Sequence, residues 1–174
     1  MLPLRQYRLL VGLFPVIYIV HNAEEWIVFN RRIAVILNII PANFMSLLPN
    51  EAQTISVVFG IALFVATIIP LIVAMIIWNK PSILNVKILL VIAFITLINA
   101  ISHISSSFAL GFISPGFITG ILLCIPFSIV IIYSIRKYYK FSMKQYLLFG
   151  FSSIMLFLLG IGLSWSIGLL IVSR

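Results

Sequence analysis

The chain has 174 residues, of which 63% are hydrophobic and only 8% are charged. Soluble domains carry about 25% charged residues, so the composition excludes a water-soluble globular protein and predicts an integral membrane protein. The net charge is +8, but the basic residues lie in short tracts between apolar runs, as in loops at a lipid surface, and we expect no nucleic-acid partner.

Five segments are long and apolar enough to cross a bilayer, which takes about 20 residues. They are residues 9–29, 54–78, 86–108, 116–135 and 146–172. They predict an all-α fold, a polytopic membrane bundle of five transmembrane helices in one domain, residues 1–174. Arg5 and Arg8 resemble the start of a signal peptide, but no cleavage site follows, so we expect the first helix to be retained.

The first predicted span contains polar residues. Leu9 to Val20 would cover only about 18 Å as a helix, so the residues up to Phe29 are needed to complete the crossing. This places Glu24 and Glu25 inside the hydrocarbon or at its margin. After this span, the apolar piece Ile33–Ile40 is too short to cross, and we expect it to form an interfacial or re-entrant segment on the outer side.

The orientation follows from the positions of the basic residues. With the N-terminus inside and the C-terminus outside, only three basic residues, Arg31, Arg32 and Arg174, lie outside. The inner side then carries the other eight: Arg5, Arg8, Lys80, Lys87, Arg136, Lys137, Lys140 and Lys144.

Two helices offer packing signals. Gly160, Ser164 and Gly168 recur every four residues and predict a ridge of small residues that allows a close helix contact. Pro126 removes a backbone donor from the fourth span and predicts a kink.

A polar cluster lies in the first span. His21, Glu24 and Glu25 fall on one side of a helix, because residues three and four apart are neighbours there. The chain has only two histidines and three acidic residues, so this run contains one of the former and two of the latter. The third span contains Asn99 and His103, again four residues apart. Both sets fall in the outer halves of their spans, which predicts one shared site.

Charge balance narrows the chemistry of this site. An unpaired charge in a bilayer costs at least about 2.5–3.5 kcal/mol, and no lysine or arginine lies in the interior of a predicted span. The carboxylates could be protonated, a histidine could be positively charged, or a divalent cation could sit between them. Mixtures of histidine and glutamate suit zinc or iron.

The residues resemble a known family, the bacterial membrane proteins named for their HxxEE motif. His21-Asn22-Ala23-Glu24-Glu25 matches that motif, and Asn99 to His103 and Pro115-Gly116 match the further Asn-x-x-x-His and Pro-Gly elements. The resemblance implies a multi-pass protein of the bacterial cytoplasmic membrane. The family has no established function, and the resemblance supplies no substrate.

The first hypothesis for function is a membrane-embedded, metal-dependent hydrolase or related lipid-modifying enzyme. His21, Glu25 and His103 would hold zinc or iron, Glu24 would act as general base, and Asn99 would orient a ligand or a substrate oxygen. The substrate would be a lipid or a lipid-linked small molecule from the outer leaflet, reached beneath the uncharged loop around Pro115-Gly116 and the segment between Ile33 and Leu48.

Three alternatives remain open. Glu24 or Glu25 could work with a histidine as a metal-free acid and base pair, as in an isomerase acting on an apolar substrate. The cluster could instead belong to a small cation- or proton-coupled carrier, assembled as an oligomer. It could also only fix helix packing in a non-catalytic assembly partner.

Overall fold

The computed structural model describes residues 1–40, 43, 48–49 and 51–173. Throughout this part of the chain the only regular structure is helical, which confirms the predicted all-α class. The elements are α1 (Leu4–Ile39), α3 (Ala52–Ile77), α4 (Ile83–Leu110), α5 (Phe117–Thr119), the π-helical turn η1 (Gly120–Cys124), α6 (Ile125–Tyr138) and α7 (Met143–Val172).

Four helices of the described chain are long and apolar enough to cross a membrane. They are α3, α4, the continuous helix Phe117–Tyr138 formed by α5, η1 and α6, and α7. Helix α1 has the length, with 36 residues, but does not meet the same measure of apolarity, because the polar cluster lies within it. The helical membrane bundle is therefore confirmed, and the crossing of α1 stays a prediction.

Helix α1 is longer than the sequence predicts. The piece Ile33–Ile39 continues α1 and does not form a separate interfacial element. No glycine or proline lies between Phe29 and Ile40, so nothing in the local sequence ends the helix there. The rest of the predicted outer segment falls partly on residues 41–42, 44–47 and 50, outside the described residues.

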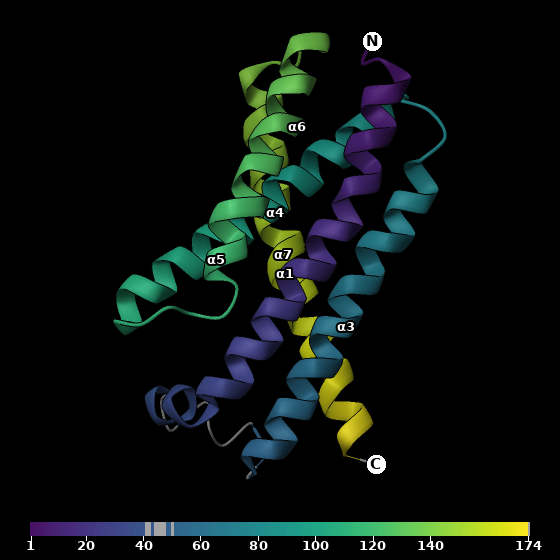
Figure 1. Cartoon of the computed structure of the whole chain (residues 1–174). Helices are drawn as coiled ribbons and strands as arrows, with labels where there is room; N and C mark the ends of the chain where they lie inside the picture. Colours follow the sequence, from purple (N-terminus) through teal and green to yellow (C-terminus); the bar gives the residue numbers. More distant parts are fainter. Residues whose placement is uncertain (41–42, 44–47, 50, 174) are drawn as a thin grey trace.

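The two termini lie at opposite ends of the molecule (Figure 1). Helix α1 packs along α3, α7 packs against α3 and α4, and α4 packs against η1 and α6. The site described below lies between α1, α4 and α5, so it joins elements that are far apart in sequence.

An apolar core fills the end of the bundle near the N-terminus. It is built from the start of α1, the end of α3, the start of α4 and the end of α6, with Val11, Leu89 and Ile131 fully buried. The Tyr7 hydroxyl donates to the carbonyl of Ile77 at 2.6 Å, which satisfies its polar group within the core. This packing holds the start of α1 in the bundle, at the end away from the polar cluster.

The turn η1 marks a change in the helix that carries α5. Pro126 has no N–H to offer to the preceding turn, and the π-helical turn Gly120–Cys124 ends two residues before it. Gly120 faces α4, where a Cβ would stand 3.5 Å from the Cα of Ala100. The predicted irregularity at Pro126 thus takes the form of a π-turn beside the site.

The small residues of α7 allow a close contact with α3, as predicted. Ser164 and Gly168 are buried, and a Cβ on Gly168 would stand 2.7 Å from the carbonyl oxygen of Val58. Gly160 does not take part in this contact, because no atom lies within 4 Å of the position that a Cβ on Gly160 would occupy.

We therefore expect Gly168→Ala to lower the free energy of unfolding by about 1–3 kcal/mol, since the added methyl would overlap backbone. Gly160→Ala is the matched control and should leave stability unchanged or slightly raised. Thermal unfolding of both variants in detergent micelles tests this, and equal stability of the two would contradict the described α3–α7 contact.

Candidate metal centre

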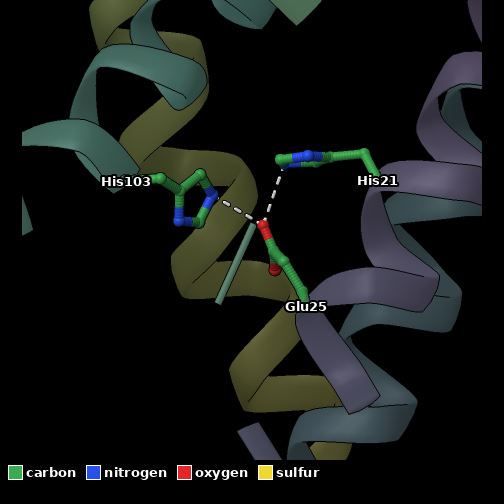
Figure 2. A group of neighbouring side chains, drawn as sticks. All are labelled: His21, Glu25 and His103. Carbon is green, nitrogen blue, oxygen red and sulfur yellow. Dashed lines mark ion pairs between the residues drawn. The ribbon is translucent and has the colours of Figure 1, made fainter. Parts of the chain in front are cut away.

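Three side chains from two helices meet at one carboxylate oxygen (Figure 2). His21 and Glu25 lie one turn apart on α1, and His103 comes from α4. Oε1 of Glu25 lies 3.0 Å from Nε2 of His21 and 2.6 Å from Nε2 of His103. His21 is fully buried and Glu25 is only 7% exposed. The predicted meeting of the first and third spans is therefore confirmed.

These three residues could hold a metal ion. Each offers one ligand atom, and the three atoms lie within 4.8 Å of one another. The two imidazole rings approach edge to face, with their centroids 5.1 Å apart. Two nitrogens and one carboxylate oxygen form a donor set that is typical of zinc sites.

The Nε2 atom of His103 has an unusual environment. It is buried and makes no hydrogen bond within the described chain, although it lies 2.6 Å from the Glu25 oxygen. The two atoms are close enough for an ion pair, but their relative orientation is not that of a hydrogen bond. A buried polar atom without a hydrogen bond is costly, and a cation between nitrogen and oxygen would satisfy both.

Asn99 also reaches the site. Its Nδ2 lies 2.8 Å from Nε2 of His21, and it lies on α4 one turn before His103. The sequence prediction that Asn99 belongs with the histidines is thus confirmed in its geometry.

Glu24 turns away from this group and toward α5. Its Oε2 accepts from the backbone N–H of Thr119 at 2.7 Å and from the Thr119 hydroxyl. Its Oε1 accepts from the backbone N–H of Ile118 at 3.2 Å. These N–H groups lie in the first turn of a helix, where backbone donors have no partner within the helix. Glu24 therefore caps the helix that starts at Phe117.

Thr119 connects Glu24 to His21. Its hydroxyl oxygen lies 2.7 Å from Nδ1 of His21 while it donates to Glu24. Sequence reasoning did not find this residue, because a single threonine in an apolar run carries no signal of its own. It becomes visible only once α1 and α5 are placed together.

Gly116 covers the site from the loop before α5. Its φ is +78°, in the left-handed region that favours glycine. A Cβ there would stand 2.9 Å from Nε2 of His103 and 2.9 Å from Cε1 of His21. The loop is fastened to α4 by Ser114, whose hydroxyl donates to the carbonyl of His103 at 2.7 Å. Glycine thus leaves a space beside the ligand atoms that any other residue would fill.

The residues of the site lie in a part of the chain that matches a protein-family model. Residues 12–131 match the family model described as a protein of unknown function with HXXEE motif. The chain belongs to this HXXEE family. The matched range contains His21, Glu24, Glu25, Asn99, His103, Gly116 and Thr119. No curated protein and no solved structure matches the chain.

We expect Gly116→Ala to lower stability by more than Gly111→Ala. Both glycines have positive φ, at 78° and 69°, so both variants lose about 1–2 kcal/mol to backbone strain. Only at Gly116 would the methyl also overlap the site, because nothing lies within 4 Å of a Cβ at Gly111. Thermal unfolding in detergent measures the difference, and a larger loss in Gly111→Ala would contradict this account.

Proposed function

We propose that this HXXEE protein is a membrane-embedded, metal-dependent enzyme, a hydrolase or a related lipid-modifying enzyme. His21, Glu25 and His103 hold one divalent ion, zinc or iron. The observation that carries the proposal is the convergence of two imidazole nitrogens and one carboxylate oxygen within 4.8 Å. Catalytic zinc sites use three such protein ligands and keep a fourth position for water or substrate, whereas structural sites use four.

The spacing of the ligand atoms suits an ion after a small adjustment. Bonds of about 2.0–2.1 Å in tetrahedral directions separate two ligand atoms by about 3.4 Å. The Glu25 oxygen lies 3.0 and 2.6 Å from the two nitrogens, so these two pairs would move apart by less than ~1 Å. The two nitrogens lie within 4.8 Å of each other and would move closer by up to about 1.4 Å. The space beside Gly116 and the unsatisfied Nε2 of His103 support the same interpretation.

The charges of the three residues are compatible with a bound metal ion. Glu25 is buried, and its carboxylate faces two histidines, with no lysine or arginine in an ion pair with it among the described residues. A divalent ion would accept both nitrogen lone pairs and the carboxylate oxygen without placing a proton between crowded atoms. The one positive charge left over would be balanced by a bound hydroxide or an anionic substrate group in the fourth position. Once bound, the ion would polarise a carbonyl or phosphoryl oxygen, or activate a water molecule.

The contacts of Asn99 and those of Glu24 favour different roles for the two residues. Asn99 stands beside His21 Nε2, where its amide could orient a fourth ligand or a substrate oxygen. Glu24 already accepts three hydrogen bonds from Ile118 and Thr119. These bonds favour a positioning role for Glu24 over the general base that the sequence suggested.

The position of the site suggests the substrate class. In the predicted orientation, with the N-terminus inside, the site lies in the outer half of a bacterial cytoplasmic membrane. Helices of this apolarity are surrounded by lipid, so a lipid or a lipid-linked molecule would reach the site directly from the outer leaflet.

The metal content of the purified protein tests the ligand set. We expect about one divalent ion per chain in wild type and nearly none in His21→Ala or His103→Ala, since each removes one of three ligands. Glu51→Gln is the matched control, because the Glu51 carboxylate accepts from the Thr54 hydroxyl, outside the site. Elemental analysis by mass spectrometry gives the result. A wild-type protein that contains no metal after purification with added zinc and iron would overturn the proposal.

The reaction itself can be sought in membrane lipid extracts. Wild type reconstituted with such lipids should release a product that mass spectrometry detects, and a chelator should stop its formation. Glu25→Gln should reduce the product to background, because the amide leaves the ion without its anionic ligand, while Glu51→Gln should retain activity. A product that forms equally with chelator present would favour the metal-free acid and base alternative.

A further inference from the structure

We propose that Thr119 and Glu24 are positioning residues that keep a proton on Nδ1 of His21. This leaves Nε2 of His21 directed at Glu25 and His103, as a metal ligand requires. The inference rests on the proposed metal site for its purpose, but the position of the proton can be measured without metal.

Both carboxylate oxygens of Glu24 act as hydrogen-bond acceptors. A carboxylate can only accept hydrogen bonds, and both oxygens of Glu24 accept backbone N–H groups of α5. The positive end of the helix that runs on to Tyr138 favours a negative charge at this point. Glu24 is therefore an acceptor for whatever else approaches it.

The bond to Glu24 decides what the Thr119 hydroxyl can do toward His21. A hydroxyl has one proton to donate, and Thr119 donates it to Oε2 of Glu24. Toward Nδ1 of His21, 2.7 Å away, the same oxygen can then only accept. The proton in that contact belongs to His21, and the direction of both hydrogen bonds is fixed.

The proton on Nδ1 leaves Nε2, on the other side of the His21 ring, free to bind a metal. A hydrogen bond at one imidazole nitrogen decides which nitrogen carries the proton, and metal-binding histidines donate their second nitrogen to such a partner. Without Thr119, the remaining acceptor for the ring proton is the Glu25 oxygen, 3.0 Å from Nε2. Asn99, whose Nδ2 lies 2.8 Å from the same nitrogen, would then have to turn its amide oxygen toward the ring. A proton on Nε2 occupies the lone pair that the metal needs.

The two glutamates of the motif thus have separate roles. Neighbouring residues on a helix point about 100° apart, so Glu25 faces α4 while Glu24 faces α5. Glu25 would bind the ion, and Glu24 would act on His21 through Thr119.

Nitrogen NMR of protein labelled with ¹⁵N-histidine tests the proposal directly, in the metal-free state. The chain has only two histidines, and His103→Gln assigns their signals. In wild type we expect Nδ1 of His21 to carry a proton. In Thr119→Val we expect Nδ1 to lose it and Nε2 to gain it, whereas Thr119→Ser should keep the wild-type pattern. Glu24→Ala should also release the proton from Nδ1, because the threonine hydroxyl is then free to donate to the ring.

Thr96→Val is the matched control. Thr96 is a buried threonine on α4 whose hydroxyl contacts Tyr18 of α1 at 3.2 Å, so the variant loses a similar contact outside the site and should leave the nitrogen signals of His21 unchanged. Thr119→Val retains the backbone N–H that donates to Glu24, so the cap of α5 is kept, and thermal unfolding checks that the variant is folded. An unprotonated Nδ1 in wild type, or unchanged signals in Thr119→Val or Glu24→Ala, would overturn the proposal.

Zinc titration separates this inference from the proposed function. Loss of an outer hydrogen-bond partner weakens metal binding by about 10–100-fold, which we expect for Thr119→Val and not for Thr119→Ser. Equal zinc affinity in Thr119→Val and wild type would overturn the link between Thr119 and the metal. If wild type binds no zinc while the NMR pattern is as expected, the metal-dependent function fails and the assignment of Thr119 as a positioning residue stands.

Discussion

The structure depends on one buried carboxylate oxygen that two imidazoles share. Oε1 of Glu25 lies within 3.0 Å of Nε2 of both His21 and His103, at a depth where an uncompensated charge is costly. This contact brings the face of α1 that carries His21 and Glu25 to His103 of α4. The apolar packing around Val11 and Leu89 holds the helices together at the other end of the bundle.

The helix that begins at α5 is attached to the same motif by a different kind of interaction. Helix starts leave backbone N–H groups without partners, and within a membrane such groups must find them inside the protein. Glu24 supplies the acceptor from α1. One short run of α1 therefore forms an internal ion pair through Glu25 and supplies, through Glu24, the acceptors for backbone N–H groups at the start of a distant helix. This explains why two consecutive acidic residues are useful in a segment that otherwise favours hydrophobic residues.

The sequence was informative about spans and about the partners of His21. The lengths of the apolar segments predicted four helices that the structure contains, with ends within a few residues of the predicted ones. The four-residue spacing of His21 with Glu25, and of Asn99 with His103, predicted that each pair shares one face of its helix. The sequence was less informative where the outcome depends on three-dimensional contact. The extension of α1 through Arg31 and Arg32 to Ile39 has no stop signal to show it. The direction of Glu24 toward Thr119, and the space beside Gly116, follow only from the docking of α5 onto α1.

The lower apolarity of α1 has a consequence for biogenesis. This helix is synthesised before its partners, because the groups that contact its polar side chains come from residues 99–119, roughly half the chain later. Until those residues emerge from the ribosome, His21, Glu24 and Glu25 have only water or the insertion machinery to solvate them. On the predicted crossing of α1, its stable integration would be coupled to the arrival of α4 and α5. The same arrival would bring His103 to His21 and Glu25.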